Sequence, residues 1–309
     1  MNCALWGPSE HVGRSERDEL AARLRSLGLS VEIHGSGAPP PGSAELVVIH
    51  SKTTLSEREL DALPELRLAL TTTSGFDHID LEAAARRGVR VARCPLARRD
   101  AVADCAIAMG LALLRRLPVL NDRAREGRWM RSEMKRMSLP LVRELTVGVV
   151  GHGVIGARVA ALWNGLGATV LASDPAEPRL PETSRLIEQA DILTLHCSLS
   201  DSSRLLIDAD ALRRMRPGAL LINTARGECV DLAAVLRDRR LAGCALDVFG
   251  QEPPADLAAL ANRENILITP HSAGYHRGLG RALTEEVETT IRAFLEGQTL
   301  EHELPIRSA

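Results

Sequence analysis

The chain has 309 residues, which at roughly 150 residues per domain predicts about two domains. Hydrophobic residues make up 45% and charged residues 25%, as in ordinary globular proteins. Proteins that bind nucleic acids usually have basic surfaces and aromatic side chains that stack on bases. The net charge of −2 and an aromatic content of only 2% therefore argue against a nucleic-acid partner. The most apolar stretch, residues 101–114, is interrupted by Asp104, so we expect no membrane partner.

The basic residues are unusually biased, because 36 of the 38 are Arg and only Lys52 and Lys135 are Lys. Arg has GC-rich codons, so genome composition alone explains such a ratio. The alternative is an arginine-rich binding surface. The slightly negative net charge favours the first explanation.

The six cysteines form neither a CxxC pair nor a Cys/His cluster at zinc spacing, so we expect no metal site. They are typical of small core residues in a reducing compartment, which predicts a cytoplasmic protein. The cysteines are Cys3, Cys94, Cys105, Cys197, Cys229 and Cys244.

The first hundred residues alternate short apolar runs with amphipathic ones, which predicts an α/β unit with a largely parallel sheet. Leu20, Leu24 and Leu27 recur at helical spacing, and Gly28 is placed to end that helix. The Gly- and Pro-rich residues 35–42 predict a loop. The expected strands are Ala4–Trp6, Val31–His34, Leu46–Ile49, Leu68–Thr71 and Val89–Val91.

Residues 101–117 predict a long apolar helix that ends before Pro118, and a polar segment, residues 121–138, follows it. A second α/β series then begins, and a last helix is expected at about residues 281–296. Six strands match the full number in a doubly wound sheet. They are Val147–Val150, Thr169–Ala172, Ile192–His196, Ala219–Asn223, Cys244–Asp247 and Ile266–Thr269.

A glycine-rich turn follows the first strand of this second series and opens a helix. Its glycines would allow a tight turn, a close approach to a pyrophosphate and close packing of helix and strand. Asp174 ends the next strand, where a carboxylate accepts hydrogen bonds from a ribose diol and repels a 2′-phosphate. The pattern predicts NAD as the cofactor. The turn consists of Gly151, His152, Gly153, Val154, Ile155 and Gly156.

Three later strand ends carry polar residues that a buried sheet does not otherwise favour. Arg226, Glu252 and His271 follow the fourth, fifth and sixth strands of the series. Ligands bind outside the carboxyl ends of such strands, so the three side chains could converge on one crevice. An Arg, a carboxylate and a His are the set needed to reduce a 2-keto acid.

The chain resembles the D-isomer-specific 2-hydroxyacid dehydrogenases over nearly its whole length. The resemblance implies NAD-dependent hydride transfer between nicotinamide and C2 of a small anionic D-2-hydroxy or 2-keto acid. Two alternatives remain open: an NAD-sensing, corepressor-like regulator on the same fold, and a dehydrogenase for a phosphorylated or phosphonate 2-hydroxy acid. The resemblance lies in residues 74–80, 102–104, 151–156, 174–175, 213, 215–219, 223–227, 245–249, 252–253 and 269–271.

The resemblance also implies a role for each of the polar residues. Arg226 would bind the substrate carboxylate and keto oxygen, and His271 would be the general acid and base, paired with Glu252. The backbone amides of Ser74 and Gly75 would bind the carboxylate as well. Residues implied to contact the cofactor are Gly151, Gly153, Val154, Ile155, Gly156, Asp174, His196, Cys197, Thr224, Ala225, Asp247 and Gly274.

The implied architecture is two doubly wound parallel-sheet domains. A flavodoxin-like substrate domain would comprise residues 1–98 plus 277–309, and a Rossmann NAD-binding domain would comprise residues 99–276. The crossings near residues 95–101 and 275–281 would act as hinges. The helix at 101–117 and the arm at 118–140 resemble the family's dimer contact, so a homodimer is expected.

Three arginines near the first crossing bear on the substrate. Arg93, Arg98 and Arg99 stand where the family often has Asn or small residues, and they could bind a second anionic group. The alternative is a solvated basic turn balanced by Asp100 and Asp104.

Overall fold

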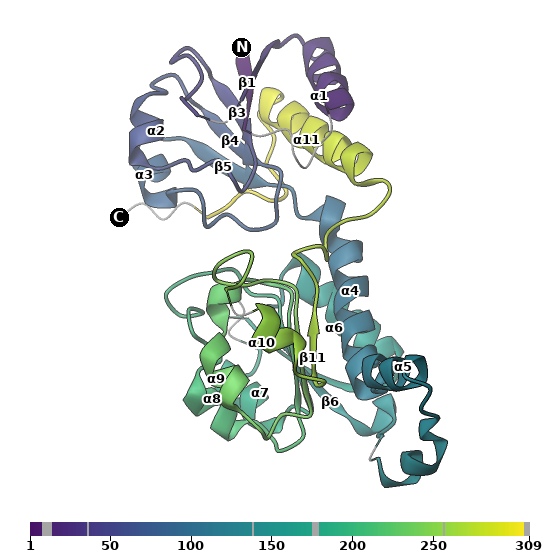
Figure 1. Ribbon diagram of the computed structural model, residues 1–309. Helices are drawn as coiled ribbons and strands as arrows, with labels where there is room; N and C mark the ends of the chain where they lie inside the picture. The colour runs from purple at the N-terminus through teal and green to yellow at the C-terminus, as the bar shows by residue number, and fades with distance from the viewer. Residues whose placement is uncertain (8–13, 36, 138, 175–178, 256, 306–309) are drawn as a thin grey trace. The chain divides into compact units, whose positions relative to one another are not determined.

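The computed structural model describes residues 1–7, 14–35, 37–137, 139–174, 179–255 and 257–305. The chain divides into two compact units, unit 1 with residues 1–98 and 276–309, and unit 2 with residues 99–275. Each unit contains one parallel sheet flanked by helices (Figure 1), which confirms the predicted α/β class. Each of the eleven predicted strands corresponds to an observed strand.

Unit 1 has five strands in the order β2-β1-β3-β4-β5, the order of flavodoxin-like sheets. Its strands are β1 (Asn2–Trp6), β2 (Ser30–His34), β3 (Leu46–Ile49), β4 (Leu68–Thr71) and β5 (Arg90–Arg93). Two helices, α1 and α11, lie side by side on one face of the sheet (Figure 1). The helices are α1 (Arg14–Ser26), α2 (Glu57–Asp61), α3 (Leu81–Arg86) and α11 (Leu279–Leu295).

The core of unit 1 forms on both faces of this sheet, because alternate strand residues point to opposite faces. On β1, Cys3 and Leu5 pack with buried residues of α1 and α11, whereas Ala4 and Trp6 pack with α2 and α3. The apolar face of α11 includes Ile291, which has no exposed surface. The C-terminal helix therefore completes the core of the unit in which the chain begins.

Unit 2 has six strands in the order β11-β10-β9-β8-β6-β7. The chain moves from β6 to β7 in one direction and returns to β8 on the other side of β6. The switch point, where ligands bind in open α/β sheets, therefore lies between β6 and β8. The strands are β6 (Thr146–Val150), β7 (Thr169–Ser173), β8 (Ile192–Leu195), β9 (Leu220–Asn223), β10 (Gly243–Leu246) and β11 (Ile266–Ile268).

Helices cover both faces of the second sheet. On one face α6 and the part of α4 in this unit bury Trp163, and on the other face α7, α8 and α9 pack against the sheet. The helices are α4 (Leu96–Leu114), α5 (Leu117–Arg125), α6 (Val154–Gly165), α7 (Thr183–Gln189), α8 (Ala209–Arg214), α9 (Leu232–Arg237) and α10 (Leu257–Ala261). Three 3₁₀ helices are η1 (Met130–Arg136), η2 (Val142–Glu144) and η3 (Gly227–Cys229). Within the described part of the chain, no helix is both long enough and apolar enough to cross a membrane.

The prediction for residues 101–138 was wrong in two respects. Helix α4 begins five residues earlier than expected, where the N–H groups of Leu96 and Ala97 donate to the Glu286 carboxylate at 2.9 and 2.8 Å. Pro118 was expected just after the end of a helix, but it lies in the first turn of the next helix, α5. The missing N–H of a proline needs no partner at that position. Arg116, with φ of 53°, separates the two helices.

The buried face of α11 makes its packing testable. We expect Ile291→Ala to lower the free energy of unfolding by about 2–5 kcal/mol, because the smaller side chain leaves a cavity in the unit 1 core. Urea unfolding followed by circular dichroism measures the change. Thr289→Ala, at an exposed position of the same helix, is the control and should change stability by less than about 0.5 kcal/mol. Equal effects of the two substitutions would contradict the packing described here.

Candidate active site

The glycine-rich turn lies between β6 and α6, at the switch point of the unit 2 sheet. Gly151 has φ of +89°, and a Cβ atom there would lie 2.5 Å from the backbone nitrogen of Cys197. A Cβ atom on Gly156 would lie 1.8 Å from the Gly151 carbonyl oxygen. Only glycine fits these two positions, and the turn therefore packs directly against the loop that follows β8.

The N-terminus of α6 suits an anionic group. Gly153 is its N-cap residue, and no side chain caps the helix. A Cβ atom on Gly153 would meet nothing within 4 Å, so the space beside the first turn is open. The first N–H groups of a helix and its dipole favour a phosphate at such a position. Val154 and Ile155 are the first two residues of α6, and the turn fits the pyrophosphate of a dinucleotide.

Asp174 lies directly after β7 and is joined to the glycine turn. Its Oδ2 accepts a hydrogen bond from the His152 backbone nitrogen at 2.7 Å. The carboxylate therefore stands at the carboxyl edge of the sheet beside the glycine turn, as a ribose-binding carboxylate requires. Residues 175–178, which supply no Arg or Lys in the sequence, lie outside the described residues.

The loop after β8 places His196 and Cys197 beside the glycine turn. Burial lowers the pKa of His196 to about 3, so its ring is neutral near pH 7. The ring nitrogens lie 2.8 Å from Thr194 Oγ1 and 3.5 Å from Thr224 Oγ1. A hydrogen bond with Cys229 and burial both raise the pKa of the Cys197 thiol. A thiol held in its neutral form favours the predicted packing role over a nucleophilic one.

Arg226 is positioned by a residue that the sequence did not single out for a role. Asn223, at the end of β9, is fully buried, and its side chain accepts a hydrogen bond from the Ala225 nitrogen at 3.0 Å. The same side chain donates to the Arg226 carbonyl at 2.8 Å. The Arg226 guanidinium also donates to the Ala225 carbonyl at 2.8 Å. Asn223 thus fixes the loop that carries the arginine.

Asp247 performs a similar task after β10 and is only 1% exposed. Its Oδ1 accepts hydrogen bonds from Thr269 Oγ1 at 2.6 Å and from the Ser272 nitrogen at 2.8 Å. Its Oδ2 accepts one from the Ala273 nitrogen at 3.1 Å, one residue before Gly274. The sequence assigned Asp247 to the cofactor, and the structure adds that its carboxylate anchors the loop after β11.

This loop carries His271 in the left-handed region, with φ of 52°, and its nitrogen donates to the Asp247 carbonyl at 2.7 Å. The ring Nδ1 lies 2.8 Å from Glu252 Oε2, so the structure brings these two predicted residues together. Glu252 Oε1 in turn accepts from the Phe249 nitrogen at 3.0 Å. Within the described residues His271 Nε2 has no hydrogen-bond partner, and the side chain is 55% exposed. The ring is therefore oriented through one nitrogen and open at the other.

In unit 1, Ser74 and Gly75 lie in the loop after β4. None of the described residues accepts a hydrogen bond from either backbone N–H group. Ser74 Oγ is buried and has no hydrogen-bond partner among these residues. Consecutive N–H groups without acceptors are typical of an anion-binding loop. This loop is therefore a candidate binding site for a carboxylate.

Arg93, Arg98 and Arg99, the candidates for binding a second anionic group, have different surroundings. Arg99 pairs with Asp100 at 2.8 Å, but both residues lie in helix α4 and not in the basic turn of the alternative prediction. Arg98 donates to the Thr72 carbonyl at 2.5 Å, and Arg93 donates to the Ser74 carbonyl at 2.8 Å. Two of the three thus contact the backbone of the Ser74 loop.

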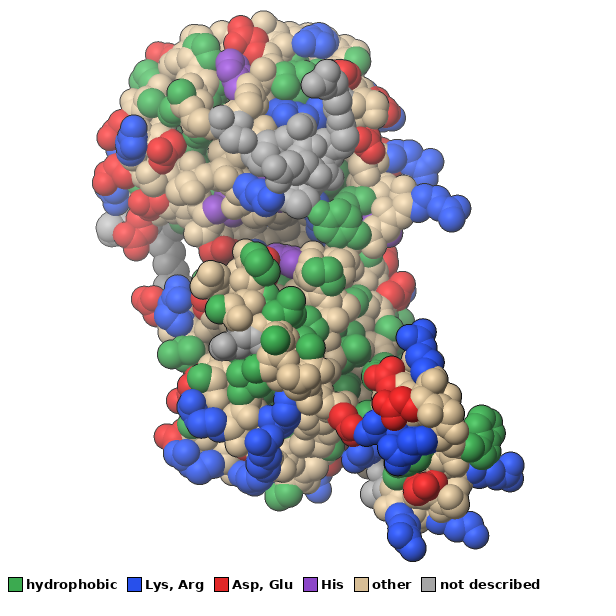
Figure 2. Space-filling view, in the orientation of Figure 1, with side chains coloured by type: hydrophobic (Ala, Val, Ile, Leu, Met, Phe, Trp, Pro, Cys, Tyr) green, Lys and Arg blue, Asp and Glu red, His purple; other side chains and the backbone are tan. Residues whose placement is uncertain are grey.

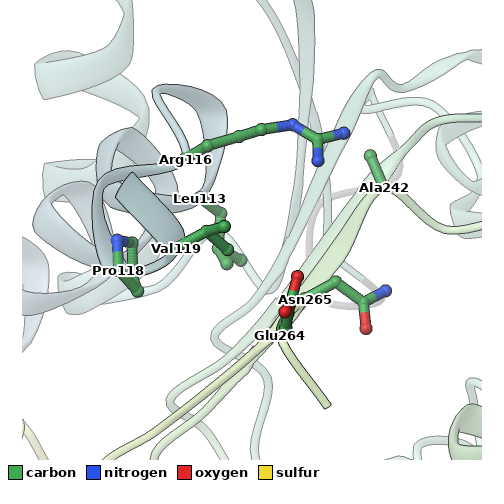
Figure 3. Close-up of a pocket in the computed structure, with 7 residues that line it drawn as sticks. All are labelled: Leu113, Arg116, Pro118, Val119, Ala242, Glu264 and Asn265. Atoms are coloured by element: carbon green, nitrogen blue, oxygen red, sulfur yellow. The ribbon is translucent and has the colours of Figure 1, made fainter. Parts of the chain in front are cut away.

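Among the described residues of unit 2, two cavities have linings that do not include Arg226, Glu252 or His271. One of about 410 Å³ lies between the loops after β9 and β10. The other, of about 200 Å³, lies at the amino ends of β10 and β11, away from the edge where ligands bind. Figure 3 shows Arg116 extending across this second cavity toward Ala242. No cluster of metal-ligating side chains occurs among the described residues.

The chain is similar to proteins of known family in sequence and in fold. The model of the D-isomer-specific 2-hydroxyacid dehydrogenase NAD-binding domain matches residues 107–273. The chain is 33% identical to a glyoxylate reductase of Korarchaeum cryptofilum over 77% of this chain and 76% of that protein. It is 32% identical to the D-3-phosphoglycerate dehydrogenase of a Synechocystis species over 86% of this chain, but spans only 48% of that relative.

A solved structure supports the same relationship. D-lactate dehydrogenase from Aquifex aeolicus, determined with NAD and lactic acid, superimposes with a TM-score of 0.84. It is 27% identical, and the match covers 99% of this chain and 100% of the other.

The contact of Gly156 with Gly151 gives a test of the turn. We expect Gly156→Ala to weaken NADH binding and to lower the free energy of unfolding by about 1–3 kcal/mol, because the added methyl group displaces the turn. Fluorescence titration with NADH and thermal unfolding measure the two effects. Gly165→Ala is the control, since a Cβ atom at the end of the same helix meets nothing within 4 Å. If both variants bound NADH like the wild type, the turn would not form the cofactor site.

Proposed function

Because the chain belongs to the D-isomer-specific 2-hydroxyacid dehydrogenase family, a group of NAD-dependent oxidoreductases, we propose that it interconverts a small D-2-hydroxy acid and its 2-keto acid. The observation that carries this proposal is the contact of His271 with Glu252. His271 lies on the loop after β11, which the Asp247 carboxylate anchors. An imidazole with one nitrogen held and the other open is suited to proton transfer.

The proposed chemistry assigns a role to each polar group. When bound in the glycine-turn site, NAD would supply the hydride to C2 of the keto acid or accept it from the hydroxy acid. During reduction His271 Nε2 gives a proton to the keto oxygen, and during oxidation it takes the proton from the hydroxyl. Glu252 accepts a hydrogen bond from Nδ1, which orients the ring and leaves Nε2 as the nitrogen that faces the substrate oxygen.

Substrate binding is assigned to three groups. Arg226 binds the carboxylate and the keto oxygen, because a guanidinium presents paired donors to such groups. The amides of Ser74 and Gly75 bind the carboxylate, and their lack of other acceptors in the described residues supports this role.

The cofactor assignments follow the order of the strands in unit 2. Asp174 favours NAD over NADP, since its carboxylate would repel a 2′-phosphate. We further propose that the residues predicted from the sequence to contact the cofactor do contact NAD. The position of the glycine turn and of the loop after β8 at the switch point of the sheet supports this proposal. That set is Gly151, Gly153, Val154, Ile155, Gly156, Asp174, His196, Cys197, Thr224, Ala225, Asp247 and Gly274.

We also propose a homodimer assembled through the segment from Leu117 to Leu141. Three large apolar side chains of this segment are exposed, Leu117 by 54%, Trp129 by 81% and Leu141 by 42%. Figure 2 shows hydrophobic side chains on the projecting region around α5, beside many charged ones. A reducing cytoplasmic location is proposed too, supported by six free cysteines.

Turnover with 2-keto acids tests the proposed activity. We expect NADH oxidation with at least one member of a panel comprising glyoxylate, pyruvate and phosphorylated and phosphonate 2-keto acids, followed by absorbance at 340 nm. His271→Ala should lower kcat by roughly a hundredfold or more, because it removes the proton donor, and should leave NADH affinity unchanged. Tight NADH binding by the wild type without turnover on any substrate would instead favour the regulatory alternative.

Sedimentation velocity tests the proposed dimer. Trp129→Asp should shift the protein from dimer to monomer, because a carboxylate would be buried at the interface without a partner. Leu166→Asp, at a position that is 45% exposed outside the segment, is the control and should remain dimeric. A wild-type protein that sediments as a monomer would disprove the assembly.

A further inference from the structure

Two arginines of the same strand have contrasting surroundings. Arg90, at the start of β5, forms a bidentate pair with Glu303 at 2.7 and 2.6 Å and lies 5.6 Å from the Phe294 ring centre. Arg93, at the end of β5, lies at the same distance from the Phe76 ring centre. None of the described carboxylates, however, forms an ion pair with Arg93. One cation of this strand is neutralised, and the other is not.

The unneutralised charge of Arg93 is partly withdrawn from water. Burial lowers the pKa of its guanidinium, and no neighbouring carboxylate opposes the effect. His302, whose backbone oxygen accepts a hydrogen bond from the Arg93 nitrogen, is held toward its neutral form by burial and adds no negative charge. Desolvating a cation without a negatively charged partner is unfavourable, and such groups concentrate at functional sites.

The position of Arg93 connects this charge to the Ser74 loop. Because β5 lies next to β4 in the parallel sheet, Arg93 stands beside the loop that follows β4. The guanidinium donates to the Ser74 carbonyl at 2.8 Å and stacks on Phe76. It therefore holds the loop at two places.

The hydrogen bond also determines where an amide points. The Ser74 C=O and the Gly75 N–H belong to the same peptide unit, and in a trans peptide they point in opposite directions. Because the carbonyl faces Arg93, the Gly75 N–H faces away from it, and no described residue accepts its hydrogen bond. Thr73 Oγ1 holds the next carbonyl, that of Gly75, at 2.8 Å.

We propose that Arg93 is a positioning and specificity residue for the substrate carboxylate: it orients the Gly75 amide and supplies a positive charge that favours anionic substrates. This inference rests on the proposed function, in which the Ser74 and Gly75 amides bind the carboxylate. Arg93 acts through the loop and through its charge. The proposal requires no direct contact with the substrate.

The test compares matched substitutions on one strand. Arg93→Met keeps an unbranched apolar side chain for the contact with Phe76 but removes the charge and the donors. We expect it to raise KM for the 2-keto acid by roughly tenfold or more, with kcat within about twofold and NADH affinity unchanged. Arg93→Gln restores a donor without the charge, and Arg93→Lys restores the charge, so each should recover part of the lost affinity.

Arg90→Met is the control, since it breaks an ion pair at the other end of β5. It should lower the melting temperature and leave KM unchanged. If Arg93 has a purely structural role, Arg93→Met and Arg90→Met should both lower stability and leave KM at the wild-type value. That result would overturn the inference. Turnover by the wild-type protein would still support the proposed function. If Arg93→Met does not fold, equal KM values for Arg93→Gln, Arg93→Lys and the wild type would also overturn it. Absence of wild-type turnover on every 2-keto acid would overturn the proposed function and this inference together.

Discussion

The parallel direction of the strands is the constraint on which both units depend. Because every strand of a sheet ends at the same edge, residues far apart in sequence reach that edge together. In unit 2 this places Gly151, Asp174, His196, Arg226 and His271 after five of the six strands of one sheet. Each candidate site residue therefore reaches this edge because it follows the carboxyl end of a strand. The chain between the strands remains available for the core.

The edge alone does not orient the side chains, and buried polar groups supply that orientation. Asn223 and Asp247 lie at the ends of neighbouring strands, and each holds the backbone of a loop. Burying a carboxylate is unfavourable unless several donors satisfy it, and Asp247 accepts from Thr269, Ser272 and Ala273. The same contacts hold the left-handed backbone of His271 in place. Rigidity at the histidine thus originates in a residue that the solvent scarcely reaches.

Most of this arrangement could be predicted from the sequence, and the failures have physical causes. Strands were predictable because their apolar runs and the residues after them are local signals. The start of α4 was not, because the Glu286 carboxylate that caps it comes from a helix 190 residues further along the chain. Pro118 was taken as a helix end, although the first turn of a helix tolerates proline equally well. The anchoring role of Asp247 was also hidden, since its donors follow a different strand.

The arginine excess also gains a physical meaning at particular positions. Several guanidiniums act on backbone carbonyls rather than on carboxylates. Arg17 donates to the carbonyls of Leu5, Gly7 and His34, at the carboxyl ends of β1 and β2. Arg93 donates to the loop after β4. A guanidinium can bridge several carbonyls because its five donors lie in one plane, whereas the ammonium of lysine is a compact, strongly hydrated point charge. Arginine at these strand ends therefore fixes backbone carbonyls, and at Arg93 it does so without an ion pair to any described carboxylate.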